Sequence, residues 1–579
     1  MISATKDELK SYFQGDRQWI VPFFQRPYVW DEDNWVSLWE NILQIYKGHQ
    51  EGRGREHFIG TIIVKERPAK RLGQNPWDLV DGQQRLATVS ILLKCLRDSC
   101  KGELPKLKDQ ISSLLLFENS KGEAFTRIKT SRNDLRYFDE IIRDHKTTDL
   151  PNQDHRMLRA YRYFKEQVKS FTDDQIDTLK AVILEKVQVV SMMLSSDDDE
   201  QVIFDTINSL GVRLTTAELL KNHIFRDEEL EHLYTTLWEP VFEADEKTVT
   251  FWDKDKTAGR LIRKNIEVLL YCYLMIATQS EIQLDSLYKE YKNWLKDKSD
   301  DDKRKFLEDL RQYAEYFADF PEGERLNEIS YVEDEKRFFH VVENLAITTV
   351  YPLILFIYRE VTDRNERRSI LKLLESYLVR RNICRWTTKN YNNLFMSMIR
   401  TLVGRRDGSQ QVSAGSIKDI LSSFTEETNR FPDDAEVRAA FGASSLSNQN
   451  AREILYLIAL YQKKSPLADV AKLSLSSYSV EHMMPVKWQQ NWPIVDPVDQ
   501  PPPSRDKAIR ILGNLTLVTG RLNSKLSNAA WDEKKKTLRR YSSLNITTDY
   551  LDGDGWDETS IYSRARDLAE LAVEMWAPL

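Results

Sequence analysis

The sequence has few cysteines and no long apolar run. Its 579 residues include only four cysteines, Cys95, Cys100, Cys272 and Cys384. Their spacing matches neither a metal site nor a disulfide framework, so we expect reduced thiols. The longest apolar runs, Val268–Ala277 and Thr349–Tyr358, are too short to cross a bilayer, which takes about 20 residues. Because the chain also starts with charged residues instead of a secretory signal, we expect a cytoplasmic protein without a membrane partner.

Further absences narrow the possible functions. No Walker A pattern occurs, which excludes a conventional P-loop nucleotide engine. There is also no internal repeat and no long low-complexity tract. The net charge of −7 argues against a uniformly basic coat for nucleic acid. The length accommodates about three or four domains.

The stretch from Val480 to Lys536 concentrates the polar residues best suited to chemistry. Glu481 and His482 form an acid–histidine pair in a strand-like run, and His482 is the only histidine after His340. Polar and apolar residues alternate from Asn514 onwards, which predicts a strand whose Asn514 side chain faces away from the apolar side. A strand with an acid–histidine pair, a hairpin strand and then a helix form the layout of a ββα-metal site.

Four polar residues of this stretch suit phosphodiester hydrolysis, which needs a base to activate water and a cation to hold the phosphate. His482 suits the base, and the oxygens of Glu481 and Asn523 suit Mg²⁺ or another divalent cation. Asn523 is expected after a turn at Gly520, where it opens a helical segment. Asn514 would hold either the imidazole or the loop in position.

A second helix should begin at a cap, Ser527 or Asn528, and carry the lysine run Lys534–Lys536. Residues 481–540 contain 11 Lys or Arg and 6 Asp or Glu. This region is therefore positive within an acidic chain, as a site that faces phosphate requires. For the lysine run by itself we favour a solvated helix face.

A second candidate site lies near the N-terminus, at Asp81–Arg85. Two buried strands are expected before it, at His57–Val64 and Trp77–Val80, and a helix with one apolar face after it. A strand, a glycine turn and a helix N-terminus bind anions through free N–H groups and the helix dipole. The two glutamines and the arginine would add donors, and Asp81 would hold Mg²⁺ or orient Arg85. A capping Asp81 that pairs structurally with Arg85 explains these residues equally well.

The aromatic segment Trp19–Trp30 contains Gln25 and Arg26 beside a proline. An arginine at this point could bind phosphate bidentately, although alone it would more often be a surface residue. We expect a helix to follow, with Asp31 or Asp33 near its start.

From about residue 236 to 450 the pattern is helical and amphipathic, without a cluster suited to catalysis. Arg380 and Arg381 follow an apolar helix face and precede Trp386. Basic residues mixed with aromatic ones could contact DNA. A helix packed through Trp386 with solvated arginines explains the pattern at least as well. The last helix, expected over Asp557–Trp576, carries an apolar stripe for packing.

The C-terminal motifs resemble those of a family of restriction enzymes. Glu481–Pro485, Gly513–Leu517 and Asn523 are similar to the signatures of the HNH (His-Me finger) nucleases, and most closely to the C-terminal domain of the GmrSD-like type IV family. By this resemblance His482 is the general base and Asn523 lies on the metal side.

The N-terminal motifs resemble the same family. Phe24–Tyr28, Phe58–Ile62 and Val80–Leu86 look like its N-terminal domain, which has a ParB/sulfiredoxin-like fold and binds and hydrolyses a nucleotide, GTP or ATP. The implied nucleotide-site residues are Asp81, Gly82, Gln83, Gln84 and Arg85, with Gln25 and Arg26 beside them.

We therefore predict a predominantly α-helical α+β protein of three parts. These are a ParB/sulfiredoxin-like nucleotide domain (residues 1–235), a helical middle (236–450) and a ββα-metal HNH nuclease domain (451–579). The predicted function is a nucleotide-regulated, Mg²⁺-dependent DNA endonuclease that restricts base-modified or phosphorothioate DNA in phage defence. A homo-oligomer is compatible with the sequence. The candidates for sensing the modification are Phe23, Phe24, Tyr28 and Trp30.

Two other functions stay open on the sequence. One is a non-enzymatic ParB-like regulator that binds DNA without cutting it. The other is a toxin-like nuclease that cuts RNA, because ββα-metal sites act on several nucleic acids.

Overall fold

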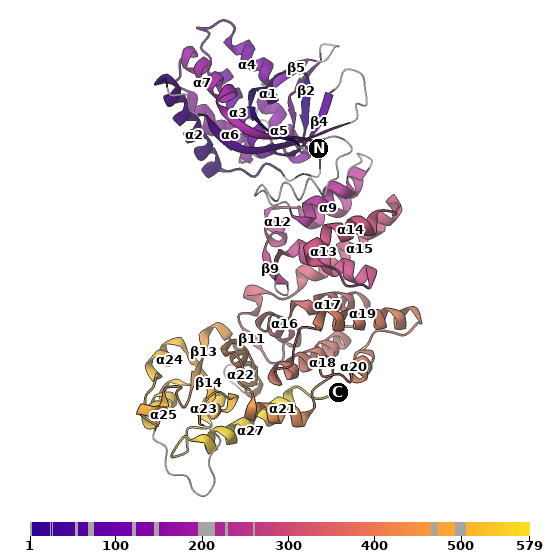
Figure 1. Ribbon diagram of the computed structural model, residues 1–579, viewed down its shortest axis with the longest axis vertical. Coiled ribbons are helices and arrows are strands. Elements are labelled where there is room, and N and C mark those ends of the chain that lie inside the picture. Colours follow the sequence, from indigo (N-terminus) through magenta and orange to yellow (C-terminus); the bar gives the residue numbers. More distant parts are fainter. Residues whose placement is uncertain are drawn as a thin grey trace. The chain divides into compact units, whose positions relative to one another are not determined.

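The computed structural model describes residues 3–23, 25, 27–52, 56–67, 75–118, 123–143, 150–194, 215–225, 230–258, 261–464, 472–492 and 505–579. The chain divides into two compact units, Met1–Tyr234 and Thr235–Leu579 (Figure 1). Most described residues are helical and the strands form small mixed sheets, which confirms the predominantly helical α+β fold class. Among the helices of the described ranges, none is long and apolar enough to cross a membrane.

A mixed six-stranded sheet organises the first unit (Figure 1). In spatial order its strands are β1 (Ser3–Glu8), β8 (Val187–Leu194), β3 (His57–Glu66), β4 (Asn75–Asp81), β2 (Arg17–Ile20) and β7 (Ile128–Lys129). β3 runs parallel to β8 and antiparallel to β4. The two strands predicted before the Asp81–Arg85 motif are confirmed, because β3 and β4 contain the expected apolar runs.

Helices enclose the core of this unit. They are α1 (Lys10–Phe13), α2 (Glu32–Gln50), α3 (Gln83–Ser99), α4 (Leu107–Leu115), α5 (Arg132–Ile142), α6 (Arg156–Val168), α7 (Asp173–Glu185) and α9 (Thr216–Ile224). α2 begins after its cap Asp31, as expected. α3 was expected to bury one face, but every residue from Leu86 to Leu96 is buried. The reason is that α3 packs against α4, α5, α6 and α7.

Helices also dominate the second unit up to Gln462. They are α11 (Glu239–Phe242), α12 (Glu246–Trp252), α13 (Asn265–Thr278), α14 (Leu287–Leu295), α15 (Asp300–Asp319), α16 (Asp334–Asn344), α17 (Tyr351–Glu360), α18 (Arg364–Ile383), α19 (Tyr391–Asp407), α20 (Ala414–Ser423), α21 (Asp434–Ala443) and α22 (Asn448–Gln462). Two short antiparallel strand pairs accompany them: the hairpin of β9 (Asp255–Ala258) and β10 (Leu261–Lys264), and the pair of β11 (Ile329–Ser330) and β12 (Lys472–Leu473), which are distant in sequence.

The structure excludes both roles considered for Arg380 and Arg381, which were contact with DNA and exposure to solvent. Both side chains are fully buried at 0 % exposure, so they neither contact DNA nor lie in solvent. Arg380 donates to the carbonyl of Trp576 (2.5 Å) and the carboxylate of Asp434 (2.6 Å). Arg381 donates to backbone carbonyls of the segment before α21, including that of Thr428 (2.9 Å). Arginine has five donors, and here they satisfy buried carbonyls.

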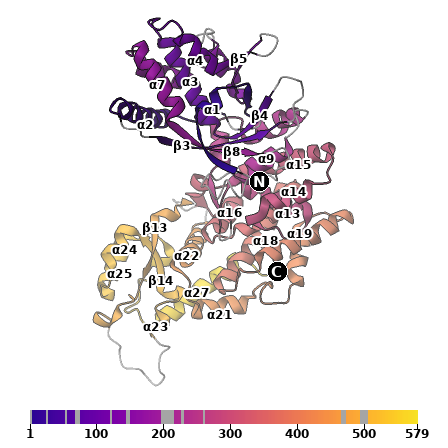
Figure 2. The ribbon, with the colours of Figure 1, turned by 45° about the horizontal axis from the view of Figure 1, so that its top comes forward.

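A small hairpin with surrounding helices completes the second unit. Its elements are β13 (Tyr478–His482), α23 (Arg505–Ala508), the 3₁₀ turn η9 (Leu512–Asn514), β14 (Leu515–Thr519), α24 (Gly520–Leu526), α25 (Trp531–Tyr541), α26 (Asn545–Thr548) and α27 (Glu558–Met575). In both Figure 1 and Figure 2, α22 lies on one side of the hairpin, and α24 and α25 lie on the other. The strand, hairpin strand and helix therefore occur in the predicted order.

Candidate functional site

The end of β13 brings Glu481 and His482 together with the following strand. β13 pairs antiparallel with β14, so that Glu481 lies opposite Thr516 and His482 opposite Leu515. Neighbouring residues of a strand project to opposite faces. The Glu481 carboxylate is therefore on the side of Ser479, whereas the imidazole of His482 points to the other side.

His482 has the properties of a neutral base. Its side chain is partly exposed, and none of the described residues forms a hydrogen bond with the imidazole. Burial of part of the ring lowers the pKa of His482 below its ordinary value, and the nearby positive charges of Lys534 and Arg510 lower this pKa further. At neutral pH the ring is therefore uncharged and able to accept a proton.

Glu481 is held by a lysine that the sequence did not single out. The Lys534 side chain, on α25, is fully buried at 0 % exposure, which corrects the expected solvated helix face. Its Nζ lies 2.5 Å from Glu481 Oε1 and donates to the carbonyl oxygen of His482 at 2.8 Å. Burial raises the pKa of Glu481 and lowers the pKa of Lys534, and the attraction between the two charges opposes both shifts.

Asn514 lies in the turn η9 before β14 rather than in the strand, and it is fully buried at 0 % exposure. Its Nδ2 donates to the carbonyls of Met484 (2.8 Å) and Ile509 (3.0 Å). Its Oδ1 accepts from the backbone of Met484 (2.8 Å) and from the indole of Trp556 (3.0 Å). Of the two expected roles, these bonds correspond to holding the loop that follows His482.

The turn η9 is also fixed from behind by α27. A Cβ at Gly513 would lie 2.1 Å from the carbonyl oxygen of Ile561, so only glycine allows this approach. The fully buried Arg564 donates to the carbonyls of Gly513 (2.7 Å) and Leu515 (2.8 Å). The strand β14 that follows is covered by α22, α24 and α26, so it is buried on both faces and does not show the expected alternation of polar and apolar sides.

Asn523 lies within α24 and reaches back to β13. Its Nδ2 donates to the carbonyl of Val480 (3.0 Å) and the hydroxyl of Ser479 (2.9 Å), which leaves Oδ1 without a hydrogen bond to the described residues. Gly520 is the first residue of α24 and does not form a separate turn before it. The residue before α25 is Ala530, so neither Ser527 nor Asn528 caps this helix as expected. Within the described part of the chain, the oxygen of the Asn523 amide is therefore available to a ligand.

Arg510 was missed by the sequence analysis. It is exposed, and among the described residues its guanidinium makes no hydrogen bond or ion pair. Asn514 bonds to both Met484 and Ile509, and Arg510 directly follows Ile509. The backbone of Arg510 therefore lies beside the turn that follows His482. No local pattern marks Arg510, because its proximity depends on this tertiary contact.

The N-terminal site starts at the end of β4. Gly82, the residue before α3, has φ of +95°, and a Cβ there would lie 2.9 Å from a side-chain atom of Ile62. Oδ2 of Asp81 is buried without a hydrogen bond to any described residue. It faces Nη1 of Arg85 at 3.7 Å, which is too long for a hydrogen bond. Asp81 therefore pairs with Arg85, as one of the alternatives predicted. It does not cap α3, because the cap position is occupied by Gly82.

A second glycine shapes the space around Arg85. Gly60 lies at an irregularity of β3 with φ of +117°, and a Cβ there would be 2.7 Å from Nε of Arg85. Nη1 of Arg85 also donates to the carbonyl of Thr61 at 3.1 Å. The Phe58–Ile62 motif and the Asp81–Arg85 motif therefore form one structure, in which β3 makes room for the guanidinium.

The glutamines divide into internal and surface positions. Gln25 donates to the carbonyls of Leu79 (3.0 Å) and Val80 (3.1 Å), so it holds its loop to the end of β4. Gln83 is partly exposed at the first position of α3. Arg26 lies outside the described residues. Gln25 therefore has a supporting contact with the site, and Gln83 is the glutamine at its surface.

Gln84 joins α3 to the aromatic loop. Its Oε1 accepts from the backbone of Val29 (2.9 Å), and its Nε2 donates to the carbonyl of Pro27 (3.2 Å). Tyr28 is buried and its hydroxyl bonds to that of Thr88 (2.6 Å), while Trp30 packs against the core. Phe24 lies outside the described residues. These contacts give Tyr28 and Trp30 a packing role in the loop.

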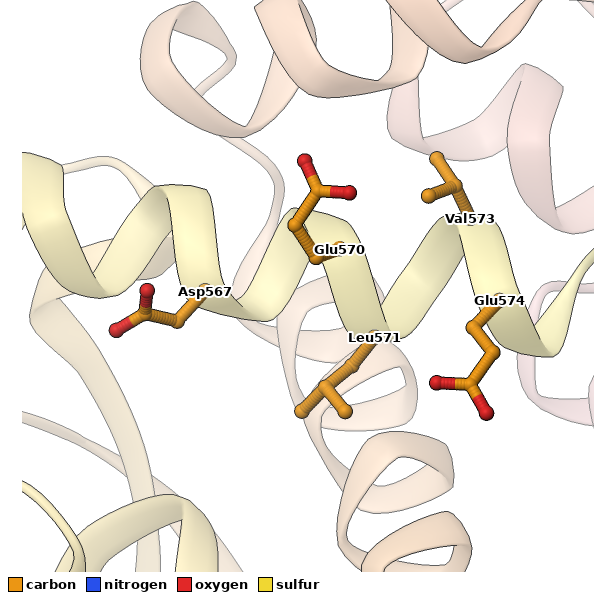
Figure 3. Close-up of a pocket in the computed structure, with 5 residues that line it drawn as sticks. All are labelled: Asp567, Glu570, Leu571, Val573 and Glu574. Carbon is orange, nitrogen blue, oxygen red and sulfur yellow. The ribbon is translucent and has the colours of Figure 1, made fainter.

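A surface hollow of about 580 Å³ lies along α27 (Figure 3). Its lining contains none of the predicted site residues: Asp567, Glu570, Leu571, Val573 and Glu574. Two of its carboxylates are already paired, Glu570 with Arg438 and Glu574 with the hydroxyl of Tyr461. The hollow therefore carries no functional assignment.

Comparison with known proteins agrees with the motifs at both ends of the chain. A family model described as GmrSD restriction endonuclease, N-terminal domain, matches residues 9–225. A second model, described as GmrSD restriction endonucleases, C-terminal domain, matches residues 431–571. A search of curated proteins gave no match. The two family models together cover more than half of the chain and include both candidate sites. The resemblance is therefore confirmed, and the chain belongs to the GmrSD restriction endonuclease family.

Proposed function

We propose that this restriction endonuclease is Mg²⁺-dependent, that His482 is its general base, and that a nucleotide bound at Asp81–Arg85 regulates cleavage of modified DNA. The observation that supports the base most strongly is the imidazole at the end of β13. It is partly exposed, has no hydrogen bond to the described residues, and is kept neutral by burial and adjacent positive charge. A base of this kind is matched to proton transfer near neutral pH.

In the proposed reaction, a ring nitrogen of His482 takes a proton from water, and the resulting hydroxide attacks phosphorus. The bond to the leaving deoxyribose oxygen breaks as the new bond forms. Asn514 contributes by fixing the loop after His482, and it does not touch the substrate in this mechanism. Asn523 bonds to Ser479 and Val480 of the same strand, so both groups belong to the end of β13.

The donor chemistry fits a hard divalent cation. Oδ1 of Asn523 has no hydrogen bond to the described residues, and only Oε1 of Glu481 is engaged by Lys534. Within the described ranges no group of three His, Cys, Asp or Glu gathers. Mg²⁺ does not require one, because it commonly binds one or two protein oxygens and completes its shell with water and phosphate. When bound by Asn523 and Glu481, Mg²⁺ would stabilise charge on the phosphate.

Arg510 is the proposed phosphate-binding side chain. An arginine forms two parallel hydrogen bonds with phosphate oxygens. Its guanidinium is exposed and unpaired among the described residues, and its backbone is held near the turn after His482. Charge that develops on the phosphate would be stabilised there.

The N-terminal site fits an anionic nucleotide. The backbone N–H groups of a first helical turn and the positive end of the helix dipole attract anions, and α3 begins directly after Gly82, whose φ is +95°. The guanidinium of Arg85 adds a phosphate donor, and the unsatisfied Oδ2 of Asp81 is suited to a hydroxyl or a magnesium-bound water. GTP and ATP both meet these requirements.

The decisive experiment is a cleavage assay with Mg²⁺, run on wild type and His482→Ala. The substrates are unmodified DNA, hydroxymethyl- or glucosyl-cytosine DNA, phosphorothioate DNA and RNA, each with and without GTP or ATP. We expect cutting of one modified DNA, stimulated by nucleotide and lost in His482→Ala. Cutting by His482→Ala at the normal rate would refute the assignment of the base. Cutting of RNA alone would support the toxin-like reading, and DNA binding without any cutting would support the regulator.

A further inference from the structure

Lys534 is a fully buried lysine beside the predicted base, and the proposed mechanism does not use it. Its side chain has 0 % exposure, although it belongs to a run of three lysines on a surface helix. An ammonium group loses its hydration when it is buried, which costs several kcal/mol unless the charge is paired. The position must therefore be explained by what Lys534 contacts.

The ammonium of Lys534 bonds to two successive residues of β13 at once. It lies 2.5 Å from Oε1 of Glu481 and 2.8 Å from the carbonyl oxygen of His482. The first contact fixes a side chain, and the second fixes the last peptide group of the strand. The direction in which the His482 ring leaves the backbone depends on the orientation of that peptide group.

Two further contacts hold the residues on either side of His482. Asn523 bonds to the carbonyl of Val480, and the carbonyl oxygen of Asn514 accepts from the backbone of Met483 at 2.9 Å. Lys534 donates to the carbonyl oxygen of His482, and the carboxylate of Glu481 accepts from the backbone of His482. The strand end is thus held before, at and after the base by three different side chains or turns.

Stability alone does not account for such a pair. Replacing a buried ion pair by apolar residues of similar volume is often neutral or stabilising. A general base, by contrast, must be held within a fraction of an ångström of its productive position. We propose that Lys534 is a positioning residue of the nuclease site, which fixes the His482 peptide and the Glu481 carboxylate relative to each other. This inference rests on the proposed function, because it acts through His482.

The test compares Lys534→Met with Lys536→Met in the full-length protein. Both substitutions remove one positive charge from α25, but Lys536 is exposed and takes no part in the contacts with Glu481 and His482. We expect Lys534→Met to lower kcat by roughly 10²-fold with a KM for DNA within about twofold of wild type, because misplacement of a catalytic group by about an ångström costs that much. Lys536→Met should keep the wild-type kcat. A folded Lys534→Met protein with normal kcat would overturn the proposal.

A second variant guards against loss of folding, since Lys534→Met leaves Glu481 buried without a partner. Lys534→Gln retains a neutral donor and should give a kcat between those of wild type and Lys534→Met, measured below the melting temperature of each variant. In Lys534→Ala, added propylammonium should restore kcat in a saturable way, with no effect on Lys536→Ala. If none of the Lys534 variants folds, Lys534 serves folding only and the proposal is wrong.

The variant His482→Ala distinguishes a failure of the proposed base from a failure of the positioning role of Lys534. If His482→Ala is inactive and the Lys534 variants are fully active, the positioning role is wrong and the assignment of the base stands. If His482→Ala is active, the assignment of the base fails, and the role of Lys534 fails with it.

Discussion

The two candidate sites hold their charged pairs in opposite environments. In the N-terminal site the side chains of Asp81 and Arg85 are 20 % and 24 % exposed and lie 3.7 Å apart. In the C-terminal site those of Glu481 and Lys534 are 8 % and 0 % exposed and lie 2.5 Å apart. The open, loosely paired charges have unused capacity for a soluble ligand. The buried charges of Glu481 and Lys534 largely neutralise each other, so the pair acts by holding the neighbouring residue His482 in place.

Both sites depend on a glycine that leaves no room for a side chain. Gly60 adjoins the guanidinium of Arg85, and Gly513 adjoins the carbonyl of Ile561. The neighbour at Gly60 is a flexible side chain, whereas the neighbour at Gly513 is backbone. A methyl group at Gly60 should therefore affect the N-terminal site locally, by displacing a side chain. A methyl group at Gly513 should affect the C-terminal site by displacing backbone.

The largest effect is expected for Gly513→Ala. Its Cβ would lie 2.1 Å from the carbonyl oxygen of Ile561 and 2.9 Å from the Cβ of Ala565, so α27 must move away from η9. We expect the free energy of unfolding of this unit to fall by about 3 kcal/mol, the upper end for overpacking. Cleavage should be lost while nucleotide turnover continues. Chemical denaturation measures the first effect, and Gly555→Ala, whose Cβ meets no atom within 4 Å, is the control. Unchanged stability would show that α27 does not pack on the turn.

A smaller and local effect is expected for Gly60→Ala. The new Cβ would lie 2.7 Å from Nε of Arg85 and push the guanidinium out of place. Nucleotide turnover should fall by roughly 10²-fold, as for other displaced catalytic groups. Gly102→Ala is the matched control, because Gly102 also has a positive φ, +90°, but a Cβ there meets no atom within 4 Å. Equal losses in both variants would mean that backbone strain, and not Arg85, causes the effect.

Local patterns were sufficient for the elements that carry the sites. The β-branched runs predicted β3 and β4, Asp31 or Asp33 was expected near the start of α2, and the motif around Glu481 and His482 predicted a strand that carries this pair. These signals lie within a few residues of each other in the sequence. The same is true of Gly82, whose left-handed conformation follows from its place between a strand and a helix.

Buried charges could not be predicted in this way. Lys534 and its partner Glu481 are 53 residues apart, and Arg380 bonds to a carbonyl 196 residues away. In sequence Lys534 and Arg380 resemble ordinary surface charges on a helix. Whether such a charge is solvated or buried is decided by which distant segments pack over it. The proximity of Arg510 to His482 was hidden for the same reason, because it depends on the bonds from Asn514 to Met484 and Ile509.

The smallest expected effect, a shift in pH dependence, tests whether Arg510 and His482 belong to one site. Only the neutral imidazole can accept a proton, so kcat should fall as pH decreases through the pKa of His482. Burial and the charges of Lys534 and Arg510 lower this pKa, so wild type should stay active somewhat below pH 6.5, the ordinary value for histidine being about 6.5.

Arg510→Ala removes one of these charges. The acidic limb should then move to higher pH by a fraction of a unit, and kcat at the plateau should fall because a phosphate ligand is lost. Lys507→Ala, an exposed lysine on α23, should leave the limb in place. If the limb of Arg510→Ala also stays in place, Arg510 lies too far from His482 to contact the same phosphate.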